Sequence, residues 1–169
     1  MAGPKIVLVG PPGSGKSTVG RLLAQRLSVG FRDLDADIEA EHGLPAGELV
    51  VELGRERFQE LEVELLGSVL AEDDGVLAVG GGTPTAPGAA ELLAPLPVVF
   101  LDVTLEELLR REGLLPLHPW LMPNPRAHLR KLLDERRPVY ESVADATVST
   151  AGRSAEEVAD EVLSALVAR

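Results

Sequence analysis

The chain has 169 residues, of which 45% are hydrophobic and 25% charged, and it carries a formal net charge of −11. This composition is typical of a globular protein, and the length suits one domain over residues 1–169. The negative charge argues against binding to nucleic acid or anionic membranes, and no apolar run is long enough to cross a bilayer. The chain has no cysteine, which excludes disulfides and thiolate metal sites. We expect a cytoplasmic monomer that acts on a small molecule.

A buried strand over residues 5–9 runs into the sequence Gly10-Pro11-Pro12-Gly13-Ser14-Gly15-Lys16-Ser17-Thr18. The spacing matches the phosphate-binding loop G-x-x-x-x-G-K-[ST], in which a glycine-rich turn joins a strand to a helix. The helix expected over residues 16–27 would direct the positive end of its dipole at the same point. The loop therefore predicts a bound nucleotide, held by Gly13, Ser14, Gly15, Lys16, Ser17 and Thr18.

Two side chains of this loop have expected roles in chemistry. Lys16 would reach the β- and γ-phosphates of ATP, and the Ser17 hydroxyl would be a ligand of Mg²⁺. Local donors must hold the phosphates, because the chain as a whole is acidic.

Two carboxylates end the second predicted strand, residues 31–35. In an extended backbone Asp33 and Asp35 point to one face, at the edge of the sheet where ligands of open α/β sheets bind. We expect Asp33 to contact the magnesium ion, directly or through water, and Asp35 to orient the acceptor hydroxyl and accept its proton. A solvated turn or a helix cap is the alternative for both residues.

The apolar pattern predicts two short helices over residues 38–53, a longer helix over 55–71 and a strand over 76–79. That strand ends in Gly80-Gly81-Gly82, where bare backbone could lie against a substrate ring. A flexible turn is an equal alternative for these glycines. The remaining elements are expected over residues 89–93, 97–103, 105–111, 126–140, 144–148 and 155–168.

A proline-rich stretch over about residues 113–125 is too long for a plain connection between helices. We interpret it as a lid that closes over the site, with His118 inside it and Trp120 as a packing anchor. The alternation of strands and helices predicts a three-layer α/β/α fold with a five-stranded parallel sheet.

Taken together, these motifs resemble the shikimate kinases, which are phosphate-binding-loop kinases of the nucleoside monophosphate kinase fold. The resemblance rests on the phosphate-binding loop, the D-x-D-x-x-I-E run from Asp33 to Glu39, the three glycines and Arg136-Arg137-Pro138-Val139-Tyr140. It implies ATP and Mg²⁺ as cofactors and acceptor-binding helices over about residues 35–72.

The resemblance also implies roles for individual residues. Asp33 would belong to the magnesium site, Asp35 would activate the acceptor hydroxyl, and Arg136 would bind the acceptor carboxylate. The acceptor pocket would be lined by Gly80, Gly81 and Gly82, and Arg111 and Arg153 would lie near the adenine. Lys16, Asp35 and Arg136 are thus the expected catalytic residues.

Two positions depart from the family pattern. An arginine usually follows the phenylalanine of the long helix, whereas here Phe58 is followed by Gln59. The lid of the family usually carries R-P-L-L, whereas here the run is His118-Pro119-Trp120-Leu121. We retain Gln59 as an acceptor contact and His118 as a nucleotide contact. Gln59 loses the charge-assisted fork, and His118 is charged only when protonated.

Three hypotheses follow from these departures. Arg55, Arg57 or Arg126 could compensate and keep shikimate as the acceptor, giving shikimate 3-phosphate for aromatic amino acid biosynthesis. The acceptor could instead be a different cyclitol or sugar acid. Finally, the chain could be a nucleotide-binding regulatory module with weak or no transfer, which the complete set of phosphate-site residues disfavours.

Overall fold

The computed structural model describes residues 3–111, 114–118 and 121–167. Within these ranges the chain forms a five-stranded sheet in the order β2-β3-β1-β4-β5, and all strand pairs are parallel. The strands are β1 Ile6–Val9, β2 Phe31–Asp33, β3 Val76–Ala78, β4 Val98–Asp102 and β5 Ala146–Ser149. The predicted α/β class and the five parallel strands are confirmed.

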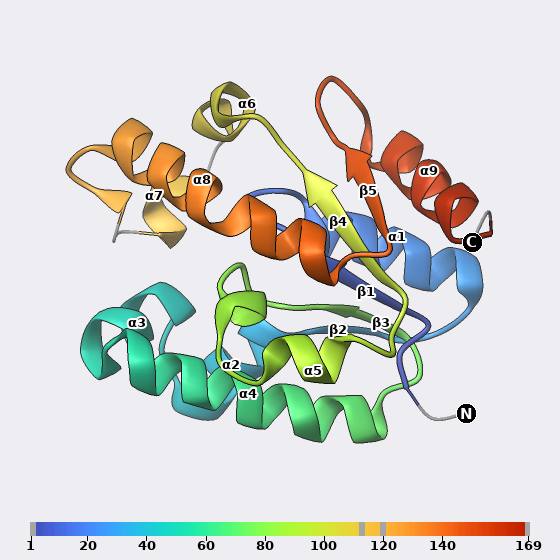
Figure 1. The fold of residues 1–169 in the computed structure, drawn as a ribbon, viewed down its shortest axis with the longest axis horizontal. Coiled ribbons are helices and arrows are strands. Elements are labelled where there is room, and N and C mark those ends of the chain that lie inside the picture. The colour runs from blue at the N-terminus through green and yellow to red at the C-terminus, as the bar shows by residue number, and fades with distance from the viewer. Residues whose placement is uncertain (1–2, 112–113, 119–120, 168–169) are drawn as a thin grey trace.

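Helices cover both faces of the sheet (Figure 1). Ile6 and Leu8 pack on one face against α1 Lys16–Leu27 and α9 Ala155–Val167. Val7 and Val9 pack on the other face, which is covered by α4 Arg55–Glu72, α5 Ala89–Leu93 and α8 Pro125–Val143. Because alternate residues of β1 are buried on opposite faces, the sheet is the middle of three layers.

Shorter elements surround the carboxyl ends of the strands. Helices α2 Leu34–His42 and α3 Ala46–Leu53 pack on α4 through Ile38, Leu49 and Phe58. Helices α6 Leu105–Arg110 and α7 Leu114–Leu117 lie near α8, and a single 3₁₀ turn, η1, covers Thr83–Thr85. Figure 1 shows α3 and α7 at the same end of the molecule.

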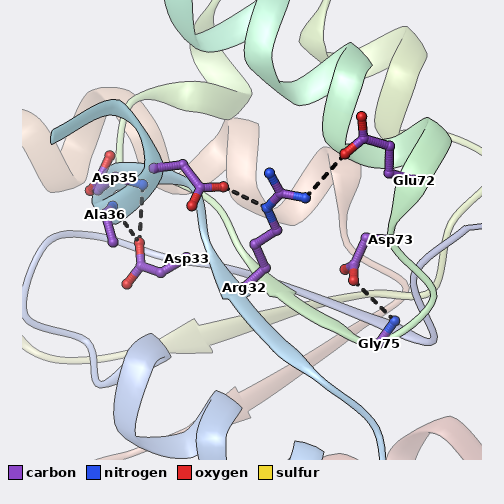
Figure 2. Close-up of polar contacts among 8 residues, drawn as sticks. Arg32, Asp33, Asp35, Ala36, Glu72, Asp73 and Gly75 are labelled. Carbon is purple, nitrogen blue, oxygen red and sulfur yellow. Dashed lines mark hydrogen bonds and ion pairs between the residues drawn. The ribbon is translucent and has the colours of Figure 1, made fainter. Parts of the chain in front are cut away.

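The second strand is shorter than the sequence predicts. It ends at Asp33, and α2 begins at Leu34, so Asp35 lies in the first turn of a helix. Asp33 Oδ1 accepts hydrogen bonds from the backbone N–H groups of Asp35, at 3.0 Å, and Ala36, at 3.3 Å (Figure 2). The expectation that both aspartates share one face of a strand was wrong, because an N-cap hydrogen bond here competes successfully with the extended backbone.

The proposed lid lies partly outside the described ranges, and so does the prediction for Trp120. Its described part contains α7, which sequence reasoning missed, and Leu114 and Leu121 pack with Leu108 and Leu129. Among the described residues no helix is long and apolar enough to span a membrane.

Candidate active site

One cavity of about 980 Å³ opens between the phosphate-binding loop and helices α3, α4, α7 and α8. Most of the residues that the sequence marks as functional line it: Gly13, Gly15, Lys16, Ser17, Thr18, Asp33, Asp35, Gln59, Gly81, Gly82, Arg111, His118 and Arg136. Ser14, Gly80 and Arg153 do not line this cavity.

The phosphate-binding loop has the backbone that a polyanion requires. Gly13 and Gly15 have φ angles of 83° and 96°, a region that side chains disfavour. Helix α1 begins at Lys16 without a side-chain cap, so its first N–H groups stay available to a ligand. Lys16 Nζ donates to the carbonyl oxygens of Gly10, at 2.8 Å, and Pro11, at 3.1 Å. Burial lowers the pKa of Lys16 to about 8, against the attraction of Asp35 and Asp33.

An oxygen pair suitable for a hard cation lies beside the loop. The Ser17 hydroxyl donates to Asp33 Oδ2 at 2.5 Å, while the other oxygen of Asp33 caps α2. Within the described residues there is no cluster of three or more His, Cys, Asp or Glu side chains that could hold a metal. Mg²⁺ bound to a nucleotide needs only one or two protein oxygens besides phosphate and water. The Ser17 and Asp33 oxygens therefore fit this ion.

The junction between β2 and α2 is supported by Arg32, which contacts both α2 and α4. Arg32 Nε donates to Asp37 Oδ2 at 2.6 Å, and its Nη1 lies 3.4 Å from Glu72 Oε2 near the end of α4 (Figure 2). Nearby, the Gly75 N–H donates to Asp73 Oδ1 at 3.3 Å. The two contacts of Arg32 connect α2 to the end of α4, and they support the segment that carries Asp33 and Asp35.

Asp35 lies against the glycine turn that follows β3. A Cβ atom at Gly80 would lie 2.6 Å from Asp35 Oδ1 and 2.9 Å from Thr83 Oγ1. Only glycine leaves room there, although Gly80 sits behind Asp35 and does not line the cavity. Burial raises the pKa of Asp35 to about 6, with Lys16 opposing the shift and Asp33 adding to it. The carboxylate is therefore a stronger base than an exposed aspartate.

A second buried carboxylate, Glu62, escaped the sequence reasoning. Its side chain is 2% exposed and accepts a hydrogen bond from Thr83 Oγ1. Burial raises its pKa to about 7, and the charge of Asp35 adds to the shift. Glu62 lies on the apolar face of α4 with Phe58, Leu66 and Val69, and this charged residue in a buried pattern was the available signal.

The glycine turn also supports Arg136 on α8. A Cβ atom at Gly82 would lie 3.2 Å from Arg136 Nη2, so the guanidinium rests against bare backbone. The Tyr140 hydroxyl donates to the carbonyl oxygen of Gly81 at 2.6 Å. Burial raises the pKa of Tyr140 to about 12, so this donor keeps its proton. This hydrogen bond fixes α8 against the glycine turn.

The two unusual positions both reach the cavity as neutral groups. Gln59 Nε2 donates to Thr85 Oγ1 at 3.4 Å. His118 Nδ1 lies 2.9 Å from the carbonyl oxygen of Leu114, which can only accept, so Nδ1 carries the proton. Burial lowers the pKa of His118, partly offset by this hydrogen bond, and so favours the neutral imidazole.

The two arginines expected near the adenine have different surroundings. Arg111 donates to the carbonyl oxygen of Gly13, and its Nη2 lies 3.4 Å from Thr150 Oγ1, so it crosses the phosphate-binding loop. Arg153 forms an ion pair with Glu161 outside the cavity. Its backbone N–H also donates to the Thr150 carbonyl oxygen at 3.3 Å, next to the Thr150 hydroxyl that Arg111 contacts.

A parallel sheet whose first strand leads into a phosphate-binding loop, with the Asp35 carboxylate in the same cavity, is typical of a phosphate-binding-loop phosphotransferase. Comparison with known proteins narrows the class. Residues 12–167 match the family model described as shikimate kinase. The chain belongs to the shikimate kinase family, and hence to the phosphotransferases with an alcohol group as acceptor.

Relatives match over nearly the whole chain. It is 49% identical to a shikimate kinase of Salinispora arenicola, covering 98% of this chain and 99% of the relative. It is 47% identical to a shikimate kinase of Streptomyces coelicolor, and the match covers 98% of this chain and 97% of that relative. The structure of the Acinetobacter baumannii shikimate kinase in complex with shikimate has a TM-score of 0.92 at 34% identity. The match covers 99% of this chain and 94% of that one. A thymidylate kinase of Candida albicans shares the fold alone, with a TM-score of 0.58 at 15% identity. The match covers 99% of this chain and 93% of that one.

Proposed function

We propose that this protein transfers the γ-phosphoryl group of MgATP to the 3-hydroxyl of shikimate. Family membership and the shikimate-bound relative support this acceptor. The observation that carries the proposal is a partly buried carboxylate, Asp35, in one cavity with the phosphate lysine, Lys16, and a guanidinium, Arg136. These groups supply a base, a phosphate contact and a carboxylate contact for one transfer reaction.

The nucleotide would be held mainly by the loop from Gly13 to Thr18. Its backbone N–H groups and Lys16 would bind the phosphates, with Ser14 supporting the turn from a buried position. Arg111 and His118 would contact the nucleotide from the lid side, and Arg153 would approach the adenine after leaving Glu161.

Ser17 and Asp33 would hold Mg²⁺, exchanging their mutual hydrogen bond for bonds to the ion. The bound ion would neutralise charge on the β- and γ-phosphates. Asp33 would keep its second oxygen on the N-terminus of α2, so the cap that positions Asp35 would stay in place.

Asp35 would act on the acceptor hydroxyl. It would accept the hydroxyl proton as the acceptor oxygen bonds to the γ-phosphorus, while the bond to the bridging β–γ oxygen breaks and ADP leaves. Lys16 would stabilise the charge on the transferring group, and Arg136 would bind the acceptor carboxylate. Gly81, Gly82 and Gln59 would surround the ring, and closure of the lid would exclude water.

A second candidate is transfer to another cyclitol or to a sugar acid, and the neutral Gln59 in the cavity is the observation that favours it. A coupled assay of ADP release separates the two candidates. We expect saturable turnover with shikimate and little with neutral cyclitols or sugar acids. Turnover with a neutral polyol alone would overturn the shikimate assignment.

A further inference from the structure

The cavity lacks two permanent cations that the family pattern leads us to expect, one at Gln59 on the acceptor side and one at His118 in the lid, yet the proposed acceptor carries a carboxylate. Three nearby arginines, Arg55, Arg57 and Arg126, could replace them on sequence grounds. The structure separates these three by what each guanidinium already contacts.

Two of the three arginines are engaged elsewhere. Arg57 Nη1 lies 2.8 Å from Glu60 and 3.8 Å from Glu64 on the outer side of α4, and it does not line the cavity. Arg126 Nη1 lies 3.5 Å from Glu106, again away from the cavity. Neither guanidinium is positioned to bind an acceptor.

Arg55 differs in both respects. It lines the cavity, four residues before Gln59 and seven before Glu62, and residues at this spacing share one face of a helix. In the described part of the chain Arg55 has no carboxylate within ion-pair distance. A cation in the first turn of a helix also opposes the helix dipole, so this position does not serve the stability of α4.

Two other basic residues that line the cavity, Lys131 and His118, are less suited than Arg55 to bind the acceptor carboxylate. Lys131 lines the cavity from α8, but its ammonium already lies 3.9 Å from the Glu135 carboxylate. His118 already uses Nδ1 in its contact with the Leu114 carbonyl oxygen, and burial favours its neutral form. Among the described residues that line the cavity, Arg136 is the other guanidinium near the glycine turn, and a carboxylate has enough lone pairs to accept from a second guanidinium as well.

We propose that Arg55 is an acceptor-binding residue that replaces the arginine missing at Gln59, one helical turn away. Together with Arg136, it binds the carboxylate of the acceptor from the opposite helix. This inference rests on the proposed function, because it takes a carboxylate-bearing acceptor as given. It makes the acceptor class an anion rather than a neutral polyol.

Binding and turnover test the inference separately. Calorimetric titration of shikimate into the intact protein should give a Kd that rises about tenfold or more in Arg55→Gln, because a charge-assisted contact is lost. Arg57→Gln is the matched control, since it removes an equal charge from the same helix outside the cavity. It should leave the Kd within about twofold. Thermal melting checks that both variants fold.

Two further comparisons identify the group that Arg55 contacts. The methyl ester of shikimate lacks the charge, so the ratio of its Kd to that of shikimate should fall about tenfold in Arg55→Gln. In the Arg55→Gln background, Gln59→Arg should restore most of the lost affinity. The affinity for MgATP should stay unchanged in all variants.

The outcomes distinguish this inference from the proposed function. Turnover of shikimate by the wild type, with a Kd that Arg55→Gln leaves unchanged, would overturn the role of Arg55 alone. Binding that depends on Arg55 without any ADP release would overturn the proposed reaction alone. An equal loss of affinity in Arg55→Gln and Arg57→Gln would reduce the effect to the general charge of α4 and also overturn the inference.

Discussion

The two halves of the cavity are built in different ways. The nucleotide half comes mainly from one run, residues 10–18, and its donors are largely backbone groups at the start of a helix. The proposed acceptor half takes Asp35 from α2, Gln59 from α4 and Arg136 from α8, so its expected groups are side chains from distant segments.

This difference bears on Gln59, the departure from the family pattern that lies on the acceptor side. Backbone donors do not change when a side chain is replaced, and the loop keeps its full motif. A side-chain contact can move to a neighbouring position on the same helix face, as we propose for Arg55 and Gln59. We therefore expect the acceptor half to be the part of the cavity that sets specificity.

The largest effect is expected from replacing Asp35, the proposed base, which acts where the two halves of the cavity meet. Asp35→Asn should lower kcat by about 10²–10⁴-fold, because the amide cannot accept the hydroxyl proton. Binding of MgATP, measured by calorimetry, should change far less, because the phosphate-binding loop is intact. A kcat within about tenfold of the wild-type value would assign the proton to another acceptor.

The next effect tests the nucleotide half. Lys16→Ala should lower kcat by about 10²–10³-fold, since it removes a charge directed at the transferring phosphoryl group. The affinity for shikimate should remain near the wild-type value if the halves bind independently. A large loss of shikimate affinity in this variant would mean that the two halves are one cooperative site.

A measurement of stability tests Glu62, the buried carboxylate near Asp35. The pKa of Glu62 is raised to about 7 in the folded protein, so its favourable contribution is present at low pH and is lost as the pH rises through 7. The free energy of unfolding of the wild type should therefore fall, relative to that of Glu62→Gln, by about 1 kcal/mol between pH 6 and pH 8. Urea unfolding of both proteins at the two pH values measures this difference.

The comparison with Glu62→Gln isolates one group, because the other titrating side chains are common to both proteins. The glutamine keeps a hydrogen-bond acceptor for Thr83. A difference in unfolding free energy that does not vary with pH would show that Glu62 is already charged in the folded protein at pH 6.

The smallest effect concerns the position that departs from the family. Gln59→Arg in the wild-type background should lower the KM for shikimate only about twofold to fivefold, because Arg55 already supplies the charge. Steady-state kinetics with shikimate measure this change. A gain of about a hundredfold would mean that Arg55 does not reach the carboxylate.

Most of the fold and the whole phosphate-binding loop could be predicted from the sequence, because both depend on local patterns. Buried strands and apolar helix positions identified the layers, and the loop motif occupies consecutive residues. The end of β2 could not be placed, because Asp33 suits both an extended strand and a helix N-cap.

The missed parts of the site depend on tertiary contacts. The contact of Arg32 with Glu72 joins segments far apart in the sequence. Glu62 is meaningful only because burial leaves it beside Thr83 and Asp35. Sequence spacing suggested Arg55, Arg57 and Arg126 equally, and they are separated by their ion pairs and by which of them lines the cavity.

Product analysis of a reaction with MgATP and shikimate tests the central claim most directly. Phosphorus NMR should show one phosphorylated shikimate, esterified at the 3-hydroxyl, for each ADP released. Release of ADP without any phosphorylated shikimate, or no response to shikimate at all, would contradict the account.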